Sequence, residues 1–220
     1  MIFLKSKEEF TMNEQVAKTI EALNKNRFAT QYHENAEKAV EELLAAIPLD
    51  ATVGIGGSWT LMELQVAENL EARGNVVYCH HKPGLTPEEV LTTRRLQLTC
   101  DVFITSTNAL TEDGKLVNED GTGNRVAAMM FGPKKVIVFT GINKIVANLE
   151  EADKRIKTIA APKNNVRLNR PNPCTKTGYC MDCQGPTRIC NIRTVIEKKP
   201  PLSDIRVWLV GEEIGYSKAP

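Results

Sequence analysis

Four of the six cysteines in this 220-residue sequence lie within seventeen residues, with the spacing C-x5-C-x2-C-x6-C. Four thiolates complete a tetrahedral zinc site or hold an iron–sulfur cluster. Residues 154–199 around them contain eleven Lys or Arg and two acidic residues, a net charge of +9 that would stabilise thiolates. The spacing matches neither a zinc ribbon nor the ferredoxin run. We therefore predict one metal centre, zinc or iron–sulfur, in preference to two disulfides or free thiols. Its ligands are Cys174, Cys180, Cys183 and Cys190.

A glycine-rich stretch, where a predicted strand runs into a predicted helix, is the second candidate. Glycine lets backbone N–H groups approach an anion, and a helix N-terminus carries about +0.5 charge. We expect a phosphate or carboxylate there, and the alternative is a tight turn that binds nothing. The stretch is not a P-loop, because no Gly-Lys-Ser/Thr is present, and it lacks the third glycine of the dinucleotide fingerprint. The candidate ligand contacts are Gly54, Gly56, Gly57, Ser58 and Thr60.

Hydroxyl, amide and carboxylate side chains and one arginine crowd residues 105–125, after the carboxyl end of another predicted strand. Such a set could hold a polar ligand, and Glu112 or Asp120 could act as a general base. The alternative is that the Asp-Gly pairs at 113 and 120 only form turns. The candidate ligand contacts here are Asn108, Thr111, Gly121, Gly123, Asn124 and Arg125.

Two further stretches follow predicted strands. Asn143 and Lys144 come after a third strand, where Lys144 would add a cation to the same edge and act in catalysis; the alternative is a solvated lysine. The pair His80-His81 follows a fourth strand. We interpret this pair as solvated loop histidines in preference to a metal or proton-transfer site.

Alternating strands and helices must position these loops. Capping boxes at residues 60–63 and 86–89 mark two helix starts, and Asn148 is placed to cap a third. The alternation favours an α/β fold with a mainly parallel sheet, whose ligand loops meet at the carboxyl edge. The pair Arg94-Arg95 falls on a helix and is expected to be solvated, whereas Cys79 and Cys100 are expected to be buried. The predicted strands are near 52–55, 76–79, 102–105, 136–140 and 205–210, and the predicted helices span 12–25, 36–47, 60–73, 87–98, 123–131 and 148–160.

Composition limits the class of protein. A hydrophobic fraction of 42% indicates a globular chain, and its length fits a single α/β domain over residues 1–220. Residues 161–203, with six prolines and four cysteines, are predicted to form an irregular Cys-rich subregion. No apolar run approaches the ~20 residues of a membrane span, and no signal-like core begins the chain, so we expect a cytoplasmic protein without a membrane. Nucleic acid is disfavoured because Tyr179 is the only aromatic residue in the basic segment.

The motifs resemble those of the lactate-utilisation (LUD) domain family. The matching stretches are residues 56–63, 101–118, 120–127, 131–136, 141–146 and 174–191, and the likeness extends over roughly 12–215. The resemblance implies a Rossmann-like fold similar to ribose-phosphate isomerases, glucosamine-phosphate deaminases and CoA transferases. Some members of the family belong to the set that oxidises lactate to pyruvate with iron–sulfur partner subunits.

Two functions follow from these expectations. One is an enzyme or enzyme subunit acting on a small anionic metabolite, by lactate/pyruvate-type oxidation or sugar-phosphate-like chemistry. The other is a metal-containing accessory or electron-transfer protein without its own substrate. The sequence has neither tandem ferredoxin-type cysteine runs nor a flavin fingerprint, which disfavours a complete lactate dehydrogenase on this chain.

Overall fold

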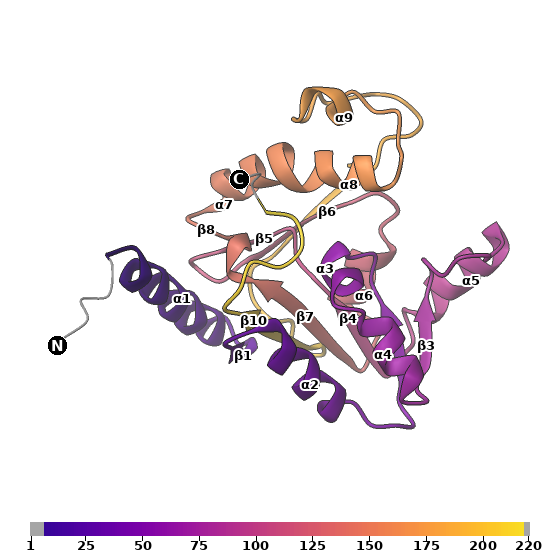
Figure 1. Cartoon of the computed structure of the whole chain (residues 1–220), viewed down its shortest axis with the longest axis horizontal. Coiled ribbons are helices and arrows are strands. Elements are labelled where there is room, and N and C mark those ends of the chain that lie inside the picture. Colours follow the sequence, from indigo (N-terminus) through magenta and orange to yellow (C-terminus); the bar gives the residue numbers. More distant parts are fainter. Residues whose placement is uncertain (1–6, 218–220) are drawn as a thin grey trace.

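A six-stranded parallel sheet forms the centre of the protein in a computed structural model that describes residues 7–217, with side chains from residue 14 onward (Figure 1). Every strand pair in this sheet is parallel. The α/β fold with a mainly parallel sheet is therefore confirmed. In spatial order the strands are β1 (Ala29–His33), β10 (Asp204–Val210), β7 (Lys135–Gly141), β4 (Val102–Thr105), β2 (Thr52–Ile55) and β3 (Val76–Cys79).

Five of these strands lie where the sequence predicts them, and β1 is the exception. Its sequence, ATQYH, is largely exposed at the edge of the sheet and lacks the apolar alternation that reveals a strand. It pairs only with β10, so tertiary contact and not local sequence defines it.

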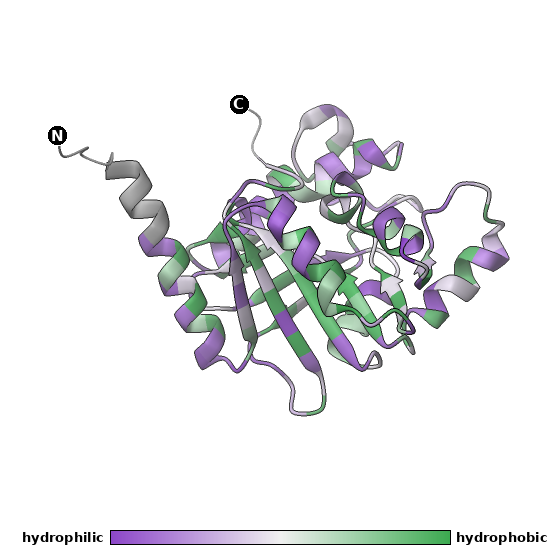
Figure 2. Cartoon of the chain, turned by 60° about the horizontal axis from the view of Figure 1, so that its bottom comes forward, coloured by the Kyte–Doolittle hydropathy of each residue, from purple (hydrophilic) through white to green (hydrophobic). Residues whose placement is uncertain are grey.

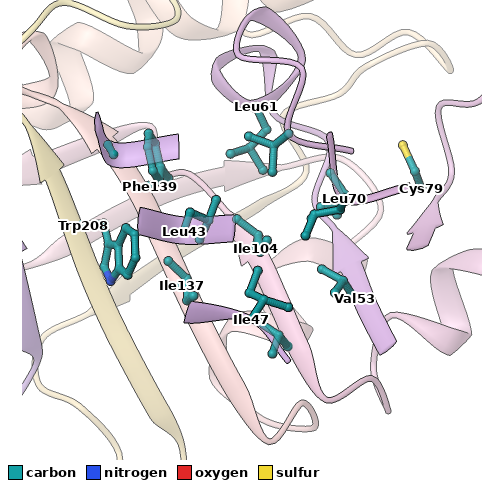
Figure 3. Packing of buried hydrophobic residues seen from close by; sticks show 14 of the residues in the cluster. Leu43, Ile47, Val53, Leu61, Leu70, Cys79, Ile104, Ile137, Phe139 and Trp208 are labelled. Carbon is teal, nitrogen blue, oxygen red and sulfur yellow. The ribbon is translucent and has the colours of Figure 1, made fainter. Parts of the chain in front are cut away.

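Both faces of the central sheet are covered. Alternate residues of β7 divide between them: Ile137 and Phe139 pack on one face, and Val136 and Val138 on the other. On the first face, Figure 3 shows leucines from the covering helices meeting the strand side chains and Trp208. The helices on that face are α2 (Ala36–Ala46), α3 (Trp59–Glu63) and α4 (Val66–Ala72).

The second face is covered partly by a smaller sheet that the sequence analysis did not predict. Helices α1 (Lys7–Lys25) and α6 (Asn124–Met130) also pack there. The strands of the small sheet are only two to five residues long. The strands β5 and β6 form a hairpin around the Asp113-Gly114 turn, whereas β8 and β9 pair with strands distant in sequence and have no local signal. Its strands, in order, are β8 (Ile145–Val146), β5 (Ala109–Thr111), β6 (Leu116–Asp120) and β9 (Ile192–Ile196).

One predicted helix is broken and one of its signals was misread. The helix expected over 60–73 divides into α3 and α4 at Gln65, whose φ is 50°. The predicted capping box at its start is wrong, because Thr60 Oγ1 accepts a hydrogen bond from Lys144 and Glu63 accepts one from the backbone N–H of Gly215. The box that begins α5 (Pro87–Leu96) is confirmed, as is the Asn148 cap.

The region expected to be irregular begins with regular structure. The helix predicted over 148–160 starts as α7 (Leu149–Arg155), widens into a π-helical turn and continues as α8 (Ala161–Arg167). Pro162 lies in the first turn of α8, where its missing N–H costs least. The Cys-rich stretch between α8 and β9 contains only the short α9 (Cys174–Thr177).

Figure 2 shows the hydrophobic strands running through the interior and hydrophilic residues on the outward sides of the helices. The buried clusters on the two faces of the sheet explain this distribution, since apolar surface removed from water is the main stabilising contribution. None of the helices in the described part of the chain is long and apolar enough to cross a membrane.

Candidate functional site

A cavity of about 230 Å³ lies at the carboxyl ends of β2, β3, β4 and β7, and part of α8 faces it. The predicted convergence of the loops is confirmed for the residues that line this cavity. They come from four separate stretches. The loops after β2, β4 and β7 meet because the carboxyl ends of parallel strands share one edge, and residues 120–125 reach the cavity from the end of β6 in the small sheet. The predicted residues found in the wall are Gly57, Ser58, Thr60, Asn108, Asp120, Gly121, Asn124, Arg125 and Lys144.

Several other predicted residues lie outside the wall. Glu112, predicted as a base, binds α1 instead: its carboxylate accepts hydrogen bonds from Gln15 Nε2 at 2.9 Å and Lys18 Nζ at 3.1 Å. Thr111 holds the hairpin turn between β5 and β6, through Asp113 and the backbone of residue 115. The hydroxyl and carboxylate side chains of residues 105–125 therefore have two kinds of position: some line the cavity, and others stabilise local structure around the turn between β5 and β6.

Three glycines and Asn143, all predicted as ligand contacts, lie outside the cavity wall and have structural roles instead. Gly54 and Gly56 permit close packing, since a Cβ would lie 2.9 Å from Cys100 Sγ in the first case and 2.7 Å from Thr105 Oγ1 in the second. Gly123 begins α6 with a φ of 92°, which favours glycine. Asn143 donates to the backbone carbonyls of the C-terminal segment.

Lys144 is buried at the cavity, with an exposed fraction of 4%. Its Nζ donates to Thr60 Oγ1 and Ser106 Oγ, both at 2.7 Å. Burial, and then the charges of Arg155 and Arg125, lower its pKa well below the ordinary value. The amine is thus biased toward its neutral form, in which it can accept a proton or attack an electrophile.

The carboxylate of Asp120 is occupied by its own loop. One oxygen accepts from the backbone N–H groups of Thr122 and Gly123, and the other pairs with Arg125 Nε at 3.1 Å. These contacts suit a positioning residue better than the general base predicted from sequence. Glu119, beside it, also lines the cavity, and burial raises the pKa of its carboxyl. The sequence analysis did not select Glu119, because the turn signal fell on Asp120.

His80 is buried and His81 half-buried against the cavity, so the interpretation as solvated loop residues is wrong. The ring centroids of His80 and His81 are 3.9 Å apart. Burial, followed by nearby positive charge, lowers the pKa of His80 to about 3 and that of His81 to about 4. Both rings are therefore neutral at pH 7.

Gln97 fixes the tautomer of His80. Its Nε2 lies 2.8 Å from the carbonyl of Ile55, 2.9 Å from that of Tyr78 and 3.0 Å from His80 Nδ1. Because two of these partners are carbonyls, the amide group there is the N–H donor, and His80 Nδ1 accepts. The imidazole proton of His80 is then on Nε2. Sequence spacing carries no signal for this contact, since Gln97 directly follows the last residue of α5 and is completely buried.

The wall carries six basic side chains and two acidic ones. Arg125 with Asp120 is the one ion pair among them within the residues whose side chains are described. Arg155 instead donates to the backbone carbonyls of residues 108, 143 and 216, and burial lowers its pKa to about 10. The basic residues that the sequence analysis did not assign to the site are Arg94, Arg155, Arg167 and Arg170.

The four clustered cysteines are free thiols beside this cavity, and Cys190 is part of its wall. Burial, then the charges of Glu119, Cys180 and Cys174, raise the pKa of Cys190 to about 12. Within residues 14–217, no group of three or more His, Cys, Asp or Glu side chains is placed to hold a metal ion. The metal centre predicted on these four cysteines, zinc or iron–sulfur, therefore stays a prediction.

The fold and cavity define an α/β protein with a cation-rich site at the carboxyl edge of a parallel sheet. The chain belongs to the LUD domain family, which it matches over residues 16–210. Its fold is similar to the crystal structure of a DUF162 family protein from Deinococcus radiodurans, with a TM-score of 0.52 and 13% sequence identity over 91% of this chain and 98% of that one. No curated protein matches the sequence.

Proposed function

We propose that this protein is an enzyme, or a subunit of one, that binds and transforms a small anionic metabolite in the cavity. The observation that carries the proposal is the excess of positive charge: five of the six basic side chains in the wall have no carboxylate partner among the described side chains. Of these five, Arg155 and Lys144 are buried, Arg94 and Arg167 are half-buried and Arg170 is exposed. A buried or half-buried cation without a counter-ion is costly, and an anionic ligand would offset that cost.

The wall also holds groups suited to proton transfer. Lys144 can act as a base or nucleophile when neutral, and burial raises the pKa of the Glu119 carboxyl, which favours its protonated, proton-donating form. Neutral His80 offers an N–H donor. Basic side chains nearby would stabilise negative charge that develops on a substrate oxygen. These groups suit the proton transfers in isomerisation of a sugar phosphate, or in oxidation of a hydroxy acid whose two electrons pass to an electron carrier on a partner subunit; the family resemblance suggests both chemistries.

Calorimetric titration with lactate, pyruvate and inorganic phosphate, each at fixed ionic strength and against chloride, tests the proposal. We expect saturable binding of at least one anion, with slower hydrogen exchange in residues 57–60. The matched variants are Lys144→Met, which should change the affinity, and Lys198→Met on the exposed surface, which should not. Binding of none of these anions, or protection confined to another part of the chain, would refute the proposal.

We propose as a second function an electron-transfer role, with an iron–sulfur cluster on Cys174, Cys180, Cys183 and Cys190. Four free thiols within seventeen residues support it. Burial raises the pKa values of Cys174 and Cys190, so a bound cluster would have to displace their protons. Thiolates are the ligands that such clusters prefer, and the cluster would exchange electrons with a partner subunit.

Anaerobic purification followed by iron and sulfide analysis tests this second role. We expect both elements in the wild type and in Cys79→Ser, whose cysteine is buried in the core, and neither in Cys183→Ser. Wild-type protein free of iron and sulfide after anaerobic reconstitution would contradict it.

A further inference from the structure

The cations of the cavity fall into two groups, joined by the loop that follows β2. At one end of this loop, Gly57 approaches His81 so closely that a Cβ would lie 3.0 Å from the ring carbon Cε1. At the other end, Thr60 accepts the hydrogen bond from Lys144. The first group, here called the histidine group, consists of His80 and His81 with Arg94 and Arg167, whose charges, in addition to burial, lower the pKa values of both rings. The second, the lysine group, consists of Lys144 with Arg125 and Arg155, whose charges, in addition to burial, lower the pKa of Lys144.

The histidine group contains nitrogen atoms that nothing in the described chain satisfies. Arg94 Nε and His81 Nε2 are both buried, and neither has a hydrogen-bond partner. Both residues line the cavity, although they come from different segments, α5 and the loop before it. A buried polar atom without a hydrogen-bond partner is rare, because the free energy lost when the atom leaves water is not recovered. A bound ligand that accepts hydrogen bonds would recover it.

The amount of charge distinguishes between ligands. A carboxylate brings one negative charge, whereas a phosphoryl group brings about 1.5 to 2 at pH 7 and three acceptor oxygens. The histidine group offers two guanidinium groups, from Arg94 and Arg167, and neither has a carboxylate partner in the described structure. Neutral His81 adds a hydrogen-bonding nitrogen without adding charge. This set matches a phosphoryl group in charge and in number of partners.

The lysine group provides for a second anionic group. Lys144 and Arg155 are both buried there without an ion pair among the described residues. A carboxylate bound beside Lys144 would raise the pKa that burial lowers, and so would favour the ammonium form of this residue in the complex. The cavity volume of about 230 Å³ limits the ligand to a small metabolite, because drug-sized ligands occupy larger pockets, from about 300 Å³.

We propose that the cavity binds a small phosphorylated carboxylic acid, with its phosphoryl group at Arg94, His81 and Arg167 and its carboxylate at Lys144 and Arg155. This inference rests on the proposed function and narrows it to one substrate class. It predicts that phosphorylated acids bind more tightly than unphosphorylated hydroxy acids such as lactate.

The test compares 2-phosphoglycolate with glycolate, which differ only in the phosphoryl group, and with inorganic phosphate, by calorimetry at fixed ionic strength. We expect 2-phosphoglycolate to bind at least tenfold more tightly than glycolate. Loss of one charge-assisted contact in Arg94→Gln should weaken 2-phosphoglycolate and phosphate by roughly 10- to 150-fold and leave glycolate within twofold. Arg95→Gln, on the next residue of α5 and outside the wall, is the matched control and should change nothing.

The outcomes separate the two proposals. If no anion binds to the wild type, the proposed function fails together with this inference. If glycolate binds as tightly as 2-phosphoglycolate, or if Arg94→Gln behaves like Arg95→Gln, only the phosphorylated class is overturned. Thermal melting of both variants establishes that each is folded before its affinity is interpreted.

Discussion

Replacing Gln97 by methionine should destabilise the protein by about 3 kcal/mol. The side chain is completely buried, and its Nε2 lies within hydrogen-bond distance of two backbone carbonyls and His80 Nδ1. Each buried hydrogen bond contributes about 1 kcal/mol net, and a stranded buried acceptor costs about 1 to 3 kcal/mol. Methionine has a similar volume, so the packing contribution is small. The loss therefore comes from the three unsatisfied acceptors.

Urea unfolding of both proteins, monitored by circular dichroism, measures this effect. The midpoint should fall while the slope m stays unchanged, because the native contacts elsewhere are retained. Gln184→Met is the control: this exposed residue donates only to the carbonyl of Asp182, and its loss should cost less than about 1 kcal/mol. A cost below about 1 kcal/mol for Gln97→Met would show that Gln97 does not hold His80 and the strand ends together.

Three further predictions concern titration and capping. Burial lowers the pKa of Lys144 in the folded state, so below the unfolded pKa of about 10.4 the unfolded chain binds more protons at this residue than the folded chain does. The free energy of unfolding of the wild type, relative to that of Lys144→Met, should therefore rise with pH up to about 10.4 in urea titrations. The pKa of His80 is about 3 in the folded state and lies below the unfolded value, so the free energy of unfolding of the wild type should fall as the pH drops from about 6.5 to 4. His80→Gln should show a smaller fall in the same assay. Equal slopes of unfolding free energy against pH for the two proteins would contradict a buried neutral ring. Removing the α5 cap in Thr86→Ala should cost about 1 kcal/mol in thermal melting, and an unchanged melting temperature would exclude the cap.

The sequence could predict elements whose signals are local. Short apolar runs located β2, β3, β4, β7 and β10, and all of these except the edge strand β3 are largely buried. The edge strand β1 and the outer strands β8 and β9 of the small sheet were missed, since their pairing partners are far away in the chain. The capping signal at Thr86 was correct, whereas the same signal at Thr60 was misleading, because Lys144 uses that hydroxyl.

The same division applies to the candidate site. The order of strands and loops was enough to bring Gly57, Asn108 and Lys144 to one edge, since parallel strands end together. Asp120 reaches the same cavity from the end of β6, in the small sheet. The sequence likewise determined that four cysteines lie close together, whatever they bind.

Only the tertiary structure decided which side chains face the cavity and which of them have partners. Arg94 and Arg95 are neighbours on one helix, yet only Arg94 lines the wall. Glu112 has the residue type of a base but binds α1. The physical reason is that charge, burial and hydrogen bonding depend on the packing of segments far apart in sequence, whereas residue type and spacing report only what each segment could do.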